Sequence, residues 1–238
     1  MGLRRFYGRH FRYWVWRLSN PLKPYEQYYA DVIGRKVIRN GRHDVIGRKS
    51  RAVRSSSELL NLMVQYGLRP SHRFVDYGCG SLRLGRALID YLEPENFHGL
   101  DVTQNFLDHG VDYIGPEVMA VKKPALDVIS PDSLTRARDR RPDYIASWHV
   151  CSKVPDHALR RYFESIIGIM HQETQVFIQF PQTDKRRRMN SLNWSLAAVD
   201  LHTIVHDIEP RLKVDIVEFI KRNDTGVTES YVRIYFPK

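Results

Sequence analysis

Two acidic residues and two glycines have the types and spacing that could hold a nucleoside. Gly78 and Gly80 follow Asp76 in one turn, and because neither glycine has a Cβ, the backbone can bend sharply and approach a ligand closely. Asp101 ends an apolar run about twenty residues later, where a carboxylate can accept hydrogen bonds from both ribose hydroxyls. These residues predict a nucleotide cradle.

The same turn discriminates between cofactors. A nicotinamide fingerprint G-x-G-x-x-G needs a third glycine where this chain has Arg83. Asp76 would repel a pyrophosphate but could face a cationic ligand. S-adenosylmethionine (SAM) carries an ammonium and a sulfonium and no phosphate. The residues therefore favour SAM over a dinucleotide.

Residues 76–85 read D-x-G-C-G-S-L-R-x-G, and together with Asp101 they resemble the class I SAM-dependent methyltransferases, more narrowly a bacterial subgroup with this motif. The resemblance covers roughly residues 55–238. It implies a Rossmann-like fold, SAM as cofactor and methyl transfer as the reaction. It also implies that Cys79 and Val102 contact the cofactor beside the glycines and Asp101.

Adenine recognition departs from the family pattern. The family often has an acidic residue after the third strand, and here Pro124 stands in its place without an N–H. We therefore expect the backbone of Ala125 or Leu126, or the carboxylate of Asp127, to contact the adenine.

Residues 146–155, after the fourth predicted strand, form the expected reaction face, with Ser147 contacting the cofactor. Trp148 could pack against the adenine or the sulfonium, or be a core residue. His149 could accept a proton from an acceptor hydroxyl, or form a structural hydrogen bond. The stretch lacks the Asn/Asp-Pro-Pro-Tyr/Phe run of amino-directed DNA methyltransferases, which disfavours DNA base methylation.

The basic run at residues 185–188 follows the fifth predicted strand. Lys185, Arg186 and Arg187 could hold a phosphate, sulfate or carboxylate of the acceptor, or simply be solvated. We expect the acceptor to offer an oxygen or nitrogen on a small or carbohydrate-like, anionic molecule. The alternatives are RNA methylation and a non-catalytic scaffold that keeps the fold.

Strand and helix patterns alternate along the chain, which predicts an α/β, three-layer, doubly wound sandwich. Its seven-stranded sheet is mostly parallel, with one strand reversed by a C-terminal hairpin. The predicted strands are 73–77, 97–101, 117–121, 143–147, 174–180, 212–220 and 230–236. The predicted helices are 82–92, 103–109, 131–138, 156–171, 191–207 and one that a capping box opens at Ser55 to Glu58.

Charge divides the chain into an extension, 1–54, and a SAM-binding domain, 55–238. The whole chain has a net charge of +10, yet the extension holds 14 Lys and Arg against 3 Asp and Glu. A basic, aromatic arm of this kind can fold back over the domain, or bind a membrane, an anionic glycan or a nucleic acid. A repeated Asp-Val-Ile-Gly-Arg-Lys flanks Asn40-Gly41 and predicts a basic hairpin.

Tyr25, Tyr28 and Tyr29 open a short helix that could cover the cofactor, with Tyr28 and Tyr29 reaching the substrate. The ten histidines and two cysteines show no metal-ligand spacing, so we expect no metal. No apolar run approaches the length of a membrane span, and arginines interrupt the first 20 residues. We expect a cytoplasmic protein, peripheral to the membrane if the extension binds it.

Overall fold

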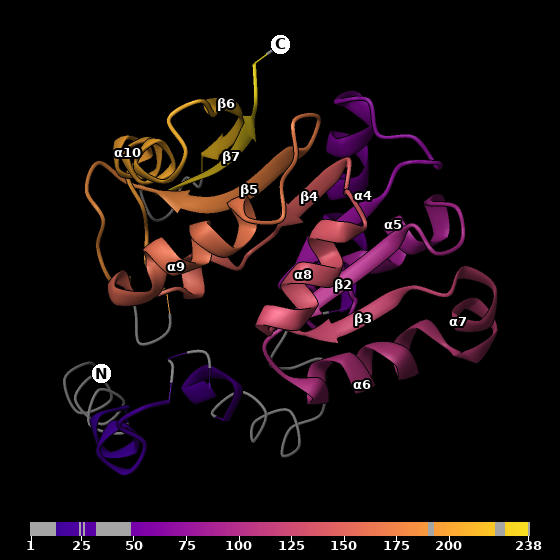
Figure 1. Ribbon diagram of the computed structural model, residues 1–238, viewed down its shortest axis with the longest axis horizontal. Coiled ribbons are helices and arrows are strands. Elements are labelled where there is room, and N and C mark those ends of the chain that lie inside the picture. Colours follow the sequence, from indigo (N-terminus) through magenta and orange to yellow (C-terminus); the bar gives the residue numbers. More distant parts are fainter. Residues whose placement is uncertain are drawn as a thin grey trace.

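The computed structural model describes residues 13–23, 25, 27–31, 49–189, 193–221 and 227–237. Its centre is a seven-stranded sheet with the strand order β3-β2-β1-β4-β5-β7-β6 (Figure 1). The strands are β1 (Phe74–Tyr77), β2 (Phe97–Asp101), β3 (Ala125–Val128), β4 (Tyr144–Ser147), β5 (Gln175–Gln182), β6 (Lys213–Lys221) and β7 (Thr228–Tyr235). Only β7 runs antiparallel to its neighbours β5 and β6, so the prediction of one reversed strand is confirmed.

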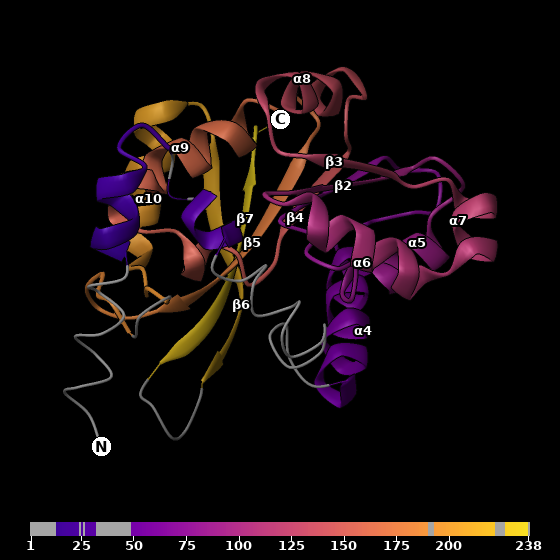
Figure 2. The same ribbon diagram turned by 90° about the horizontal axis from the view of Figure 1, so that it is seen from below.

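Helices cover both faces of the sheet and make the three layers expected (Figure 2). One face carries α4 (Lys49–Gln65), α5 (Gly85–Tyr91), α6 (Gln104–Ile114) and α7 (Pro116–Lys122). The other face carries α8 (Pro131–Asp139), α9 (Asp156–Ile167) and α10 (Ala198–Ile208). The predicted fold class is therefore confirmed.

Alternate side chains of each strand pack into the two hydrophobic cores on opposite faces of the sheet. Val75 and Tyr77 of β1 point into the cluster under α8, α9 and α10, while Phe74 points into the cluster under α4, α5 and α6. This is the two-residue period of a strand buried on both faces. It also fixes the direction of Asp76, which follows Phe74 at the same parity and leaves β1 on the α5 side.

The third strand is misplaced in the sequence prediction. Residues 117–121 belong to α7 and not to a strand, because Gly115 turns the chain with φ 89° and Pro116 starts a helix. The strand lies further on, at Ala125–Val128, and pairs in parallel with β2. Everything expected after the third strand shifts by several residues as a result.

The first and last helices also begin elsewhere than predicted. Helix α4 begins at Lys49, so the supposed capping box at Ser55 lies within the helix. Ser56 caps a different helix: its Oγ accepts a hydrogen bond from Ala87 N at the start of α5 and donates one to Leu84 O. The last helix begins at Ala198, several residues later than expected.

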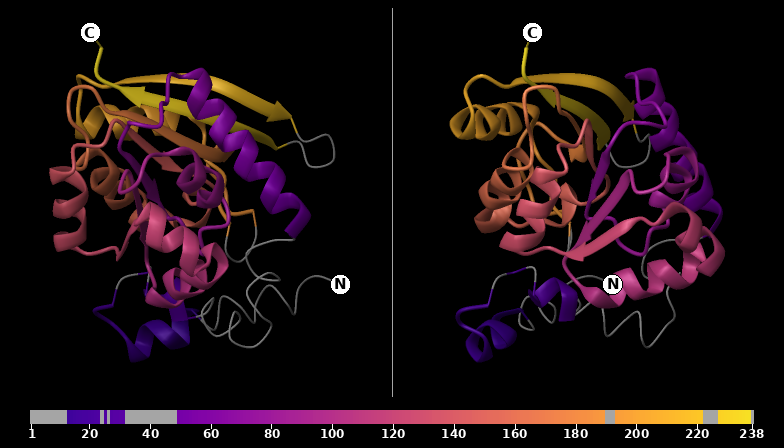
Figure 3. Two further views of the ribbon diagram at one scale, coloured as in Figure 1. Left: turned by 90° about the vertical axis from the view of Figure 1, so that its right-hand side faces the viewer. Right: turned by 45° about the vertical axis from the view of Figure 1, so that its right-hand side comes forward.

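Residues 13–31 lie beside the carboxyl end of the parallel strands, where Figure 3 shows the N-terminal helices against the body. Their aromatic side chains pack with a loop that follows β5. The packed residues are Tyr13, Trp16, Tyr25, Tyr28, Tyr29 and Trp194. In the part that the structure describes, the arm therefore folds back. The predicted hairpin at residues 32–48 lies outside the described residues, and the predicted boundary at 54/55 falls inside α4.

Candidate functional site

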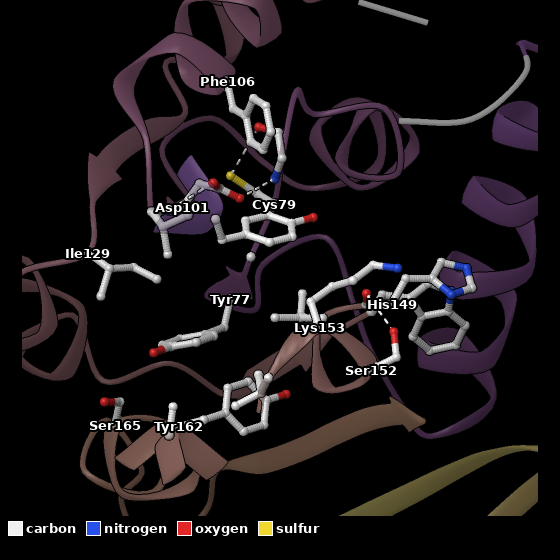
Figure 4. Close-up of a pocket in the computed structure, with 18 of the residues that line it drawn as sticks. Tyr77, Cys79, Asp101, Phe106, Ile129, His149, Ser152, Lys153, Tyr162 and Ser165 are labelled. Atoms are coloured by element: carbon white, nitrogen blue, oxygen red, sulfur yellow. Dashed lines mark hydrogen bonds between the residues drawn. The ribbon is translucent and has the colours of Figure 1, made fainter. Parts of the chain in front are cut away.

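A cavity of about 960 Å³ opens where the parallel strands end. The loops after β1 to β5 line it, and Tyr25, Gln27 and Tyr29 of the N-terminal segment close one side. Figure 4 shows Asp101 and Cys79 on one side of this space and His149 and Lys153 on another. One cavity thus joins the predicted cofactor residues to the predicted reaction face.

The glycine turn forms one wall of the cavity. Gly78 and Gly80 hold φ angles of 88° and 56°, which side-chain-bearing residues rarely adopt. A Cβ on Gly78 would come within 2.2 Å of Val150 Cγ2, whereas a Cβ on Gly80 would meet no atom within 4 Å. Gly78 therefore permits packing against the loop after β4, and Gly80 leaves its side of the turn open. Cys79 lines the same wall and is buried.

Asp101 lines the cavity at the end of β2. Its Oδ2 accepts a hydrogen bond from Gly80 N at 2.7 Å, and its Oδ1 accepts one from Val102 N at 2.7 Å. Burial raises the pKa of this carboxyl to about 6, although the backbone amides act in the opposite direction. The carboxylate and the glycine turn are therefore held as one unit, with Val102 also lining the cavity.

Asp76 does not line the cavity. Its parity on β1 directs it beneath α5, where Oδ2 lies 3.5 Å from the position of a Cβ built on Gly85. That oxygen is buried and has no hydrogen-bond partner in the part of the chain that the structure describes. Burial, followed by the charge of Asp101, raises the pKa of Asp76 to about 7. The structure gives Asp76 no direct contact with the cavity, contrary to our expectation.

The shift of the third strand relocates the expected adenine contacts. Ala125 and Leu126 lie within β3 and do not line the cavity; Val128, Ile129 and Ser130 do. Asp127 is also engaged elsewhere, because it accepts hydrogen bonds from Arg136 and contacts His98 Nε2 at 2.9 Å.

Trp148 and His149 both line the cavity. The Trp148 ring packs against Tyr231 at a centroid distance of 4.6 Å and is almost fully buried, so it serves the core and the cavity wall together. His149 holds φ 60°, and its backbone N–H donates to Gln179 Oε1 at 3.0 Å. A non-glycine residue in this conformation is strained, a property that clusters at functional sites.

Ser147 lies next to these residues but does not line the cavity. Its Oγ donates to Tyr77 O at 2.9 Å and accepts from the Tyr162 hydroxyl at 2.7 Å. Because the side chain is fully buried in this network, the structure assigns Ser147 to the join between β4, β1 and α9.

The basic run after β5 does not reach the cavity. Lys185 and Arg187 are exposed, and Arg186 pairs with Asp156 and donates to Val154 O at 2.9 Å. Of the predicted lid tyrosines, Tyr25 and Tyr29 line the cavity, whereas Tyr28 does not and packs in the aromatic cluster.

Besides Arg161, two cations of the cavity wall were not predicted. Arg83, which the sequence shows only as a break in the dinucleotide fingerprint, has Nε and Nη1 buried without a hydrogen-bond partner among the described residues. Lys153 belongs to a short helical turn (Cys151–Lys153) after β4, and no motif marks it. Burial lowers the pKa of both groups.

The described residues contain neither a group suited to bind a metal ion nor a helix suited to span a membrane. They contain no group of three or more His, Cys, Asp or Glu that could hold a metal ion. Among them, no helix has both the length and the apolar character that crossing a membrane requires.

No protein-family model and no curated protein matches this chain. Solved structures do. Magnesium protoporphyrin IX methyltransferase (ChlM) from Synechocystis PCC 6803, with bound SAH, superposes with a TM-score of 0.61 at 11% identity, over 89% of this chain and 98% of its own. The methyltransferase domain of bacterial CtHen1 gives 0.53 at 15% identity, over 80% and 98%.

The glycopeptide N-methyltransferase MtfA, in complex with sinefungin, gives a TM-score of 0.55 at 10% identity, over 77% of this chain and 94% of its own. At such identities the likeness concerns the backbone alone. It agrees with the strand order, the reversed β7 and the cavity at the carboxyl ends of the strands. The chain therefore has the Rossmann-like fold of the class I SAM-dependent methyltransferases.

Proposed function

We propose that this protein is a SAM-dependent methyltransferase. The observation that carries the proposal is the single cavity, which has the Gly78–Gly80 turn and Asp101 at one side and His149 at the other. The solved neighbours support it, since the three described above are methyltransferases and two of these structures contain a bound SAH or sinefungin.

The residues present fit such a cofactor. Asp101 is held by two amides and lines the cavity, so its carboxylate can accept from ribose hydroxyls. The open side of Gly80 leaves room for a close approach of the ligand, and the guanidinium of Arg83, a residue of the cavity wall, suits the carboxylate of the cofactor's methionine. When bound, SAM supplies a methyl carbon whose bond pair stays on sulfur as the acceptor's lone pair forms the new bond.

For the acceptor we propose an oxygen or nitrogen of a small, anionic molecule. Methyl transfer from a sulfonium depends mainly on alignment, so the chain's task is to position the acceptor and exclude water. Trp148 forms a rigid apolar wall, because Tyr231 packs against it. His149 lies at the cavity surface, where its imidazole can accept the acceptor's proton.

Calorimetric titration of SAM and S-adenosylhomocysteine tests the cofactor proposal. We expect both to bind the wild type and Asp101→Ala to lose affinity about 100-fold, since a buried charge-assisted acceptor is removed. Asp127→Ala is the matched control, because Asp127 is a strand-borne carboxylate outside the cavity. No binding to the wild type would contradict the proposal. Binding without turnover on any of a panel of anionic acceptors would favour the scaffold alternative.

For the N-terminal segment we propose contact with an anionic membrane surface. Trp14, Leu18 and Leu22 are 63%, 81% and 96% exposed, an unusual run of bare apolar side chains within nine residues. Arg17 and Lys23 accompany them, and the whole extension is strongly basic. Apolar residues among cations are typical of segments that lie in a lipid interface.

Sedimentation with phosphatidylserine and phosphatidylcholine vesicles tests this contact. Trp14→Glu with Leu18→Glu should abolish the binding to anionic vesicles, and the control Val199→Glu, at a site 68% exposed on α10, should leave it intact. Equal binding by both variants would contradict the proposal. Salt-dependent binding to RNA without binding to vesicles would instead favour a nucleic-acid partner.

A further inference from the structure

Lys153 is a cation of the cavity wall that forms no ion pair with a carboxylate of the described residues. Its side chain is half-buried and lines the cavity. In the part of the chain that the structure describes, the hydrogen-bond partner of its Nζ is the neutral side-chain oxygen Asn193 Oδ1. Desolvating an ammonium is unfavourable unless an opposite charge compensates. Within the described residues, the positive charge of Lys153 is therefore not compensated by an ion pair, although the carboxylates Asp101 and Glu229 also line the cavity.

The protein holds Lys153 firmly in this position. The carbonyl of the neighbouring Ser152 accepts from Trp194 N at 2.8 Å, and the carbonyl of Val154 accepts from Arg186 Nη2 at 2.9 Å. These bonds fix the turn after β4 from both sides of Lys153. Figure 4 shows the lysine side chain extending through the cavity toward His149. Lys153 and the residue that we propose to accept the proton therefore line the same cavity.

We propose that Lys153, held by Asn193, binds an acidic group of the acceptor, a phosphate or a carboxylate, and so orients the methylated atom toward His149. The inference rests on the proposed methyltransferase function. SAM has one carboxylate, and Arg83 comes from the glycine turn that faces the cofactor. Arg161, a third cation of the wall, already has an interaction partner, which leaves Lys153, on the far side of the cavity, for the second substrate. In this proposal Lys153 binds the anionic group of the acceptor, a role that we had expected for Lys185, Arg186 and Arg187.

The test uses inorganic phosphate as probe on the full chain saturated with S-adenosylhomocysteine. Thermal unfolding is followed while phosphate replaces chloride at constant ionic strength. We expect a saturable rise in the midpoint for the wild type, and an apparent phosphate affinity about 10- to 100-fold weaker in Lys153→Met. Lys185→Met, an exposed lysine in a nearby loop, is the matched control and should respond as the wild type does.

Asn193→Asp is a second variant that retains the lysine. A carboxylate beside the ammonium should compete with phosphate and weaken the apparent phosphate affinity by a similar factor. An unchanged phosphate response in both variants, or none in the wild type, overturns the proposal. S-adenosylhomocysteine should bind Lys153→Met within about threefold of the wild type. Loss of that binding in the wild type would instead contradict the cofactor proposal, so the two failures are distinguishable.

Discussion

The two sides of the cavity are built from different parts of the chain. The cofactor side is shaped mainly by the backbone. Gly78 and Gly80 adopt positive φ angles, and the amides of Gly80 and Val102 donate hydrogen bonds to the Asp101 carboxylate. On the acceptor side, side chains from distant segments meet, as where Lys153 contacts Asn193. A site made by a local turn tolerates few residue types, whereas a site assembled across loops tolerates many.

Gly78→Ala should show the largest effect, because Gly78 connects the two sides. The new Cβ would lie 2.2 Å from Val150 Cγ2 and would require φ 88°, so we expect a loss of about 3 kcal/mol in the free energy of unfolding. Gly80→Ala is the control, with a positive φ but open space, and should lose about 1 kcal/mol. Denaturant unfolding measures both. Equal losses would show that the contact with Val150 is unimportant.

Ser147→Ala should reduce stability and spare the cofactor. The substitution removes the hydroxyl that donates to Tyr77 O and accepts from the Tyr162 hydroxyl, and we expect a loss of about 2 kcal/mol. SAM affinity measured by calorimetry should change less than twofold, about 0.4 kcal/mol. Thr203→Ala, which removes an exposed helix hydroxyl, should change neither. A large drop in SAM affinity would return Ser147 to the cofactor side.

The two buried carboxyls give stability and affinity opposite pH dependences. The folded-state pKa values, about 6 for Asp101 and about 7 for Asp76, lie above the unfolded value of 3.8, so the folded chain binds protons more tightly. Their contribution to stability is therefore fully present below pH 3.8 and is lost as the pH rises through 6 and 7.

The affinity for SAM should instead rise, by about tenfold, over the same window, because an ionised Asp101 accepts from ribose and attracts a cation. Thermal unfolding without cofactor and calorimetry between pH 5 and 8 measure the two trends. Asp76→Asn should remove the stability step nearest pH 7 and leave the Asp101 step. If both quantities change in the same direction, the assignment of these carboxyls is wrong.

Arg186→Gln should have the smallest effect, since the residue supports the acceptor side without touching it. We expect about 1 kcal/mol lower stability, because Val154 O and Asp156 lose their partner, and a phosphate response weakened about threefold. Arg187→Gln, at an exposed position of the same run, should alter stability by less than about 0.3 kcal/mol. A stronger phosphate effect in Arg187→Gln would restore the basic run as the acceptor site.

The sequence was sufficient for the number and direction of the strands, and it marked the turn of Gly78 and Gly80 with Asp101 that lines the cavity, because both rest on local rules. Apolar runs mark buried strands, and a glycine turn with a following acid marks the cradle. The third strand was misplaced because residues 117–121 are apolar enough for a strand, while Gly115-Pro116 starts a helix there. Because of that error the adenine contacts were expected at Ala125 and Leu126, which lie within β3, whereas Val128 and Ile129 line the cavity.

The acceptor side could not be predicted, because charge alone does not show where a side chain lies. Four consecutive cations suggested an anion site, yet Arg186 turns inward to bind backbone, whereas the isolated Lys153 faces the cavity. Likewise, the alternation of side chains along β1 shows in the sequence that Asp76 and Phe74 share one face of the sheet. Which helix covers Asp76 on that face, here α5, depends on tertiary packing.

Asn193 and Trp194 are consecutive residues with different partners, Lys153 in the cavity and Tyr25 in the N-terminal segment. A ligand that immobilises Asn193 through Lys153 would also restrict Trp194, and with it the tyrosine that packs on it. Thermodynamic linkage then requires reciprocity. If an acidic acceptor changes the docking equilibrium of the N-terminal segment by some factor, docking of that segment changes the affinity for the acceptor by the same factor. Binding of Trp14 and Leu18 to a surface would therefore change the affinity of the cavity for the acceptor.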